Sequence, residues 1–295
     1  MGSTTPHKGT EADGAPESGA PEGGVGFRGV VAASEAGAGR RSGMVRRARA
    51  AYVVAGVLAM LVAWQLLSFV VSPAVMASPA DTAKALAGLA WGSKLWVELL
   101  ITLKRLVIGL AMGAAVGWLL GIVAGVHRQL RSFLEPLRWV SMTVPAVIIA
   151  VLAMLWFGLG DLAVIFLVAV IVFPTMYVNT VSGVQAVDRR LTEMGQVYHF
   201  SRRLLLTEVY LPGIASPVLA GLTLATGVAV RAVVLGEVLG AMNGIGHAFS
   251  RAMAYLETPE LFAWIVVLLA LMAVIEFGVL RPVRRRIMRW RKAGG

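Results

Sequence analysis

The stretch LTEMGQVYHFSRRLLLTEVYLP, residues 191–212, is a polar and basic interruption between two long apolar segments. Such a stretch cannot remain in hydrocarbon, because charged side chains and unpaired backbone groups are costly there. The apolar segments on either side are long enough to cross a bilayer. The stretch is therefore predicted to be a loop outside the membrane, in a protein that crosses the membrane several times.

The composition of the whole chain also indicates a membrane protein. Hydrophobic residues make up 58% of the 295 residues, charged residues make up 15%, and the mean hydropathy is +0.77. A soluble protein of this length needs polar faces on its helices, whereas whole 20-residue windows here have almost none. We therefore predict an all-α integral membrane protein.

The net charge of +11 would also suit a nucleic-acid-binding protein, but its distribution indicates a membrane topology instead. Of the 27 lysines and arginines, 21 fall within four stretches, 1–49, 127–138, 182–203 and 281–295. Basic loops are retained on the cytoplasmic side of membranes. These four stretches are therefore predicted to be cytoplasmic, with both termini inside and no nucleic-acid partner.

Two parts are expected along the chain. Residues 1–43 are rich in Gly, Ala, Pro, Glu and Ser, and are predicted to form a disordered cytoplasmic tail. This tail is either an extension of the protein or the product of a start assigned upstream of Met44. Residues 44–295 are predicted to form a six-helix transmembrane domain. Its predicted segments are 51–71, 102–126, 140–157, 162–181, 214–239 and 261–280.

Glycine recurs every fourth residue in the second predicted segment. The residues are Gly109, Gly113, Gly117, Gly121 and Gly125. Residues four apart lie on nearly one face of a helix, and glycine there lets another backbone approach closely. The stripe is predicted to be a helix-packing surface inside the bundle. A sliding contact that moves as a gate opens is the alternative.

The cytoplasmic loop, residues 182–213, is much longer than the 2–8 residues that usually connect helices in a bundle. It combines arginines with apolar residues, which favours short amphipathic helices, and Pro212 disfavours helix at Leu211. Docking of a partner protein is the favoured interpretation, and an ordinary solvated loop is the alternative.

The loop sequence resembles the EAA loop of ABC importer permeases, E-A-A-x3-G-x9-I-x-L-P. Glu193, Val209, Leu211 and Pro212 match the pattern in type and spacing. At the three other positions the chain departs from it. The positions that the resemblance assigns to an ATPase interface, with their basic neighbours, are Glu193, Met194, Gly195, His199, Arg202, Arg203, Val209, Leu211 and Pro212.

Two further motifs are similar to those of the nitrate/sulfonate/taurine branch of these permeases. They are LWFGLGD at 155–161 and GEVLGAMNGIGHAF at 236–249, with the matching positions Asp161, Glu237, Gly240, Gly244 and Gly246. The resemblance implies the type I importer (MetI-like) permease fold. It also implies that the chain forms the translocation path for a small solute, an anion such as a sulfonate, taurine or nitrate.

The resemblance implies partners as well. They are a cytoplasmic ABC ATPase dimer, a second permease subunit and an extracytoplasmic solute-binding protein, at a bacterial cytoplasmic membrane. The second permease subunit is expected to be another copy of this chain, and a sibling permease is the alternative. The chain has no G-x4-G-K-[ST] phosphate loop, so a partner is expected to bind the ATP. No cofactor, catalytic site or metal site is predicted, because no Cys/His/Asp/Glu cluster has ligand spacing.

Arg231 lies inside the fifth predicted segment, where an ionisable side chain needs water or a partner. It is expected either to pair with Glu237 or Glu276, or to line the translocation path beside Glu237. Two other functions remain open from the residues alone. One is an ion-gradient-driven secondary transporter, which would show repeated halves and several intramembrane carboxylates. The other is a channel subunit.

Overall fold

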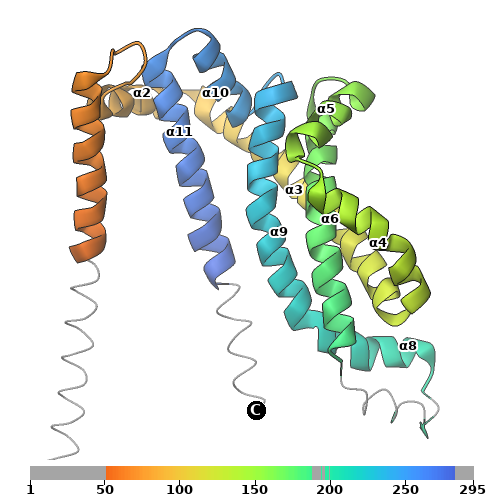
Figure 1. Ribbon diagram of the computed structural model, residues 1–295. Helices are drawn as coiled ribbons and strands as arrows, with labels where there is room; N and C mark the ends of the chain where they lie inside the picture. The colour runs from red at the N-terminus through yellow and green to blue at the C-terminus, as the bar shows by residue number, and fades with distance from the viewer. Residues whose placement is uncertain (1–50, 188–193, 195–196, 199, 283–295) are drawn as a thin grey trace, which may run out of the picture. The chain divides into compact units, whose positions relative to one another are not determined.

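The computed structural model describes residues 51–187, 194, 197–198 and 200–282 (Figure 1). Every regular element in these ranges is a helix, which confirms the predicted all-α fold class. The chain divides into two compact units, residues 1–62 and residues 63–295. In the first unit the structure describes the start of an apolar helix, Ala51–Val70, whose residues up to Val62 are all exposed. The predicted tail, 1–43, lies outside the described residues.

Within the described ranges, five helices are each long and apolar enough to cross a membrane. They are Ala51–Val70, α3 (Ser93–Val126), α6 (Asp161–Gln185), α9 (Leu211–Gly240) and the stretch Thr258–Gly278, which joins α11 (Thr258–Ala273) to the π-helical segment η2 (Val274–Leu280). Four of them begin within three residues of the predicted segments. Shorter helices lie between them: α2 (Pro79–Trp91), α4 (Arg128–Thr143), α5 (Ala146–Phe157), α8 (Arg202–Leu205), η1 (Leu206–Tyr210) and α10 (Ile245–Ala254).

Helix α3 begins at Ser93, nine residues before the predicted start at 102. Lys94 and Glu98 therefore lie between the first two predicted segments, 51–71 and 102–126. In the structure each charge has a partner, since Lys94 Nζ lies 2.6 Å from Glu260 Oε1 and Glu98 accepts a hydrogen bond from the Gly244 amide. Lysine and glutamate are good helix formers and their charges have partners here, so α3 continues through both residues.

The third predicted segment, 140–157, is not one straight helix. Helices α4 and α5 meet there at an angle of 102°. Taken together, the two helices are long and apolar enough to form a sixth membrane span. Pro145 explains the break, because proline disfavours helical backbone in the residue before it. Val144 is accordingly extended, with φ −68° and ψ 126°.

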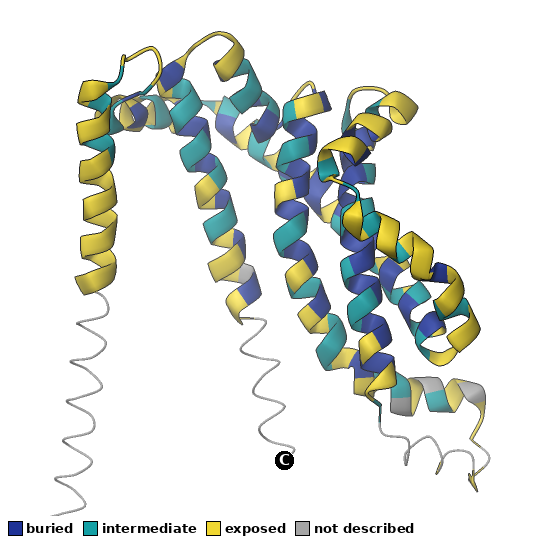
Figure 2. Ribbon diagram, in the orientation of Figure 1, coloured by how far each residue is buried: buried dark blue, intermediate teal, exposed yellow. Residues whose placement is uncertain are grey.

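Helix α6 is the best-buried of the long apolar helices. In the most apolar 18 residues of α6, 50% of the residues are buried inside the chain. The same share is 33% or less in each of the other candidate spans. Figure 2 shows buried residues along much of its length. Glycines of α3 pack closely against one side of α6, and α9 also packs along it. Helices α3, α6 and α9 therefore form the core that positions the site described next.

Candidate functional site

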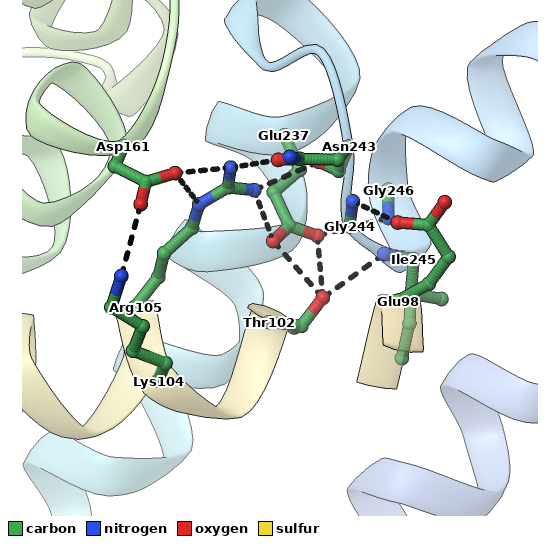
Figure 3. Close-up of polar contacts among 10 residues, drawn as sticks. All are labelled: Glu98, Thr102, Lys104, Arg105, Asp161, Glu237, Asn243, Gly244, Ile245 and Gly246. Atoms are coloured by element: carbon green, nitrogen blue, oxygen red, sulfur yellow. Dashed lines mark hydrogen bonds and ion pairs between the residues drawn. The ribbon is translucent and has the colours of Figure 1, made fainter. Parts of the chain in front are cut away.

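Three helices and one turn meet at a group of polar side chains with a buried centre, which we call the Arg105 cluster (Figure 3). Helix α3 contributes one side of it, the first residue of α6 a second, the end of α9 a third, and the turn before α10 the fourth. The members are Glu98, Thr102, Arg105, Asp161, Glu237, Asn243, Gly244, Ile245 and Gly246, with Lys104 at the edge.

The guanidinium of Arg105 is the centre of the cluster. The side chain is only 1% exposed, yet it contacts two carboxylates on two other helices. Its Nη2 lies 2.5 Å from Asp161 Oδ1, its Nε lies 2.9 Å from the same oxygen, and its Nη1 lies 2.8 Å from Glu237 Oε1. It also donates to the carbonyl oxygen of Asn243 at 2.8 Å and to the amide oxygen of that side chain. The planar, multiply donating guanidinium suits this task, and the single ammonium of lysine does not.

Glu237 has no exposed surface, so its charge depends on the partners around it. Besides Arg105, Thr102 Oγ1 lies 2.9 Å and 3.0 Å from its two carboxylate oxygens, and the Gly246 amide donates to Oε2 at 3.0 Å. A buried ion pair is tolerated only when such additional hydrogen bonds satisfy its remaining polar atoms. Glu237 meets this condition.

The cluster also caps helix α10. The first backbone N–H groups of a helix have no partner inside it and need acceptors elsewhere. Here the Gly244 amide donates to Glu98, the Ile245 amide donates to Thr102 Oγ1 at 2.9 Å, and the Gly246 amide donates to Glu237. Gly244 has a φ of +99°, a backbone conformation that side chains disfavour and glycine accepts.

The cluster joins the two sequence motifs that the chain shares with one branch of permeases. Asp161 ends the first motif, and Glu237, Gly244 and Gly246 belong to the second. The two motifs are also linked directly, because the Gly160 amide donates to the Gly240 carbonyl at 2.9 Å. Arg105, which lies outside both motifs, connects them. The sequence did offer a signal for Arg105. The residue lies inside a long apolar helix, and a buried cation there needs an anion as its partner.

The structure places the two residues expected on a translocation path in different surroundings. Glu237 is enclosed in the cluster, so it lines no exposed surface of this chain. Arg231 is exposed, and it forms no ion pair with Glu237 or Glu276 among the described contacts. The expected pairing of Arg231 with Glu237 is wrong, because Arg105 occupies that carboxylate. Leu224 and Gly227 lie on the same face of α9 as Arg231, and nothing lies within 4 Å of a Cβ built on Gly227.

The five glycines of α3 lie where that helix meets α6. A Cβ built on Gly109 would lie 2.7 Å from Val168 Cβ, and one on Gly121 would lie 2.6 Å from Thr180 Cβ. The same holds at Gly113, Gly117 and Gly125, which face Ala169, Phe173 and Val184. The stripe therefore lets the backbones of α3 and α6 approach more closely than any side chain would permit.

Replacing Gly117 with alanine is expected to destabilise the fold by about 1–3 kcal/mol, the usual cost of overpacking. A Cβ there would lie 2.6 Å from the Phe173 carbonyl oxygen, which belongs to the backbone and cannot move aside. The matched control is Gly88→Ala in α2, where nothing lies within 4 Å and alanine is expected to be neutral or stabilising. Unfolding by SDS in mixed micelles measures both. Equal stability of the two variants would contradict the packing role.

Part of the predicted coupling loop lies within the described residues. Glu193, Gly195 and His199, and the side chains of Arg202 and Val209, lie outside the described residues. Met194 and Arg203 are exposed, Leu211 and Pro212 form the first residues of α9, and α8 with η1 leads into it. Among the described residues, no three His, Asp or Glu side chains are placed to hold a metal ion.

The chain is similar to known transport proteins. Residues 113–288 match the family model described as binding-protein-dependent transport system inner membrane component. SsuC of Escherichia coli (strain K12), whose name describes an aliphatic sulfonates transport permease, is 30% identical over 78% of this chain and 88% of its own. TauC of the same organism, the taurine transport system permease protein, is 29% identical over 66% of this chain and 71% of its own.

Solved structures share the fold. An amino acid ABC transporter crystallised with histidines aligns over 68% of this chain and 97% of its own, with a TM-score of 0.56 and 16% identity. The MetNI methionine ABC transporter in an inward-facing conformation aligns over 65% and 94%, with a TM-score of 0.53 and 18% identity.

Proposed function

This chain belongs to the family of binding-protein-dependent transport system inner membrane components, and we propose that its 182–213 loop couples an ABC ATPase to the import of a small anion. The permease role itself follows from the family. The match to residues 113–288 carries the proposal, because that range includes the loop, the helices α6 and α9 on either side of it and most of the glycine stripe. The chain is not expected to hydrolyse ATP.

The proposed topology places both termini and the 182–213 loop in the cytoplasm, as the distribution of basic residues favours. Helix α6 then begins outside, so the Arg105 cluster lies toward the external end of α3, α6 and α9. The loop lies at the opposite end of α6 and α9. Two rigid helices thus connect the proposed ATPase contact with the cluster, which suits a lever that biases a two-state gate.

The proposed partners are a cytoplasmic ATPase dimer, a second copy of this chain and an external solute-binding protein. A second copy would cover the uncovered face of α9 that carries Arg231. Affinity purification of the tagged chain in mild detergent tests the assembly. We expect an ABC ATPase and an extracytoplasmic binding protein to co-purify, and their reproducible absence would contradict it.

The proposed solute is a sulfonate, with taurine as the first compound to test. The names of the SsuC and TauC relatives support it. Arg231 supports it as well, because an exposed cation on a membrane helix must face water or a partner rather than lipid, and a guanidinium binds oxyanions with paired hydrogen bonds.

Replacing Arg231 with alanine in the assembled transporter is expected to weaken uptake of the anion roughly tenfold or more, the effect of losing one charge-assisted hydrogen bond. Because the side chain is exposed, the amount of folded protein is expected not to change. Arg231→Lys, which keeps the charge, is the control and is expected to retain part of the uptake. Unaltered uptake by Arg231→Ala would exclude Arg231 from the path.

A further inference from the structure

A second charged region lies at the other end of α3 and α6 from the Arg105 cluster. A cavity of about 500 Å³ opens where α3 ends, α4 begins, α6 ends and η1 leads into α9. Arg128 and Arg131 line it from α4, Gln185 from α6 and Tyr210 from η1. This volume is in the range of small-ligand sites. Polar residues from three separate elements therefore converge on one cavity.

The described lining of the cavity is basic. Two of its lining residues are arginines, and none of the described lining residues is acidic. An adjoining hollow of about 680 Å³ shares Val126 and Arg128 with it and is lined further by His127, Gln129 and Ser132. Arg128 therefore stands between two open spaces. Guanidinium groups in such a place favour a phosphate, whose oxygens accept their hydrogen bonds in pairs.

The cavity lies at the border between apolar and polar sequence. Residues 106–126 of α3 carry no charged side chain, and His127 and Arg128 follow directly. Helix α4 then exposes Phe133 and Trp139, which are 78% and 62% exposed and would contact lipid at the membrane interface. A ligand with a phosphate group and an attached apolar chain would match the arginines of the cavity and the exposed apolar residues of α4.

We infer that this cavity binds the phosphate of an anionic phospholipid from the cytoplasmic leaflet. Arg128 and Arg131 bind the headgroup, while the acyl chains lie along the exposed apolar residues nearby. Anionic lipids collect at the cytoplasmic surface and bind in basic pockets between membrane helices. Gln185 and Tyr210 lie at the two ends of the 182–213 loop, so the bound headgroup would contact both ends of the proposed coupling element. The inference rests on the proposed topology.

Lipid-dependent thermal unfolding of the detergent-solubilised transporter tests the inference. The probes are dioctanoyl-phosphatidylglycerol, dioctanoyl-phosphatidylcholine and inorganic phosphate, each titrated against the wild type and the Arg128→Gln/Arg131→Gln variant. We expect phosphatidylglycerol to raise the unfolding midpoint of the wild type. The concentration needed for half of that rise is expected to increase on the order of tenfold in the variant, through loss of charge-assisted hydrogen bonds.

Arg138→Gln is the matched control. Arg138 lies on the same helix, but it pairs with Glu135 and does not line the cavity, so the variant loses one of the same charges outside the proposed site. It is expected to respond to phosphatidylglycerol as the wild type does. An equal response of the wild type and the double variant would overturn the inference. A loss that is equally large in Arg138→Gln would overturn it too, because the effect would then be one of general charge.

The titration with inorganic phosphate distinguishes a lipid headgroup from a free anion as the ligand. If inorganic phosphate raises the midpoint as much as phosphatidylglycerol does, the site takes a free anion and the lipid assignment is wrong. Because the chain has no cysteine, Ser132→Cys in the adjoining hollow reports without background on which side of the membrane this region lies. Labelling of this cysteine from outside intact cells by an impermeant maleimide would refute the proposed topology separately from the binding result.

Discussion

Replacing Arg105 with methionine is expected to lower the free energy of unfolding by about 3–5 kcal/mol, the usual cost of removing one partner from a buried ion pair. The variant leaves the carboxylate of Glu237, which is 0% exposed, without its cation. It also removes the hydrogen bonds that tie α3 to Asp161 and to the carbonyl of Asn243. Unfolding by SDS in mixed micelles, or the amount of monodisperse protein after solubilisation, measures the loss.

Lys104 provides the matched control for Arg105. It is the neighbouring residue and also contacts Asp161, at 3.4 Å, but its side chain is 62% exposed. Exposed ion pairs contribute roughly 0–1 kcal/mol, so Lys104→Met is expected to have little effect. A similar loss in both variants would mean that burial of the guanidinium is not the cause.

Glu237→Gln placed on top of Arg105→Met is expected to restore part of the lost stability. Glutamine keeps the size of the side chain and an acceptor for the Gly246 amide, but removes the charge that would be left unpaired. The double variant is therefore expected to be more stable than Arg105→Met alone. If the double variant loses as much stability as the sum of the losses in Arg105→Met and in Glu237→Gln alone, the two side chains are not coupled and the interpretation of the cluster is wrong.

Replacing Glu193 with proline is expected to abolish transport and the stimulation of ATP hydrolysis by loaded binding protein. Proline inside a helix removes a hydrogen bond and clashes with the preceding turn, at a cost of about 3 kcal/mol or more, so the proposed coupling helix would not form. Because the loop is cytoplasmic in the proposed topology, membrane insertion and the Arg105 cluster are expected to be unaffected. Stimulated ATPase activity of the purified transporter and solute uptake are the measurements.

Glu193→Ala separates the shape of the loop from its charge. Alanine removes the same carboxylate but is the best helix former, so this variant is expected to retain more coupling than Glu193→Pro. Normal stimulated hydrolysis in Glu193→Pro would reject the loop as the coupling element. Equal loss in both variants would assign the function to the carboxylate and contradict the role of the helix.

Sequence reasoning predicted the fold class, the family and the approximate starts of four of the long apolar helices, because each depends on local composition or on a spaced motif. The family match confirmed the identification that the loop pattern and the two motifs had suggested. The packing role of the glycine stripe could also be predicted, since residues four apart lie on nearly the same face of a helix.

What the sequence did not reveal depends on contacts between distant residues. Lys94 and Glu98 fell outside the predicted second segment, because a charge is costly inside a membrane until a partner such as Glu260 or the Gly244 amide is brought beside it. Arg105 was not singled out for the same reason, since its two carboxylates lie 56 and 132 residues further along the chain. Pro145 is expected to kink the third segment, but the size of the bend could not be predicted, because a proline in an apolar segment is compatible with a mild kink as well as with a 102° turn.

The most direct test of the proposed mechanism is uptake of radiolabelled solute into proteoliposomes that contain the purified permease, with and without its ATPase, in the presence of loaded binding protein. The coupling account predicts ATP-dependent uptake only when both membrane and ATPase subunits are present, and none by the permease alone. Uptake by the permease alone, driven by an imposed ion gradient or by the solute gradient itself, would contradict it.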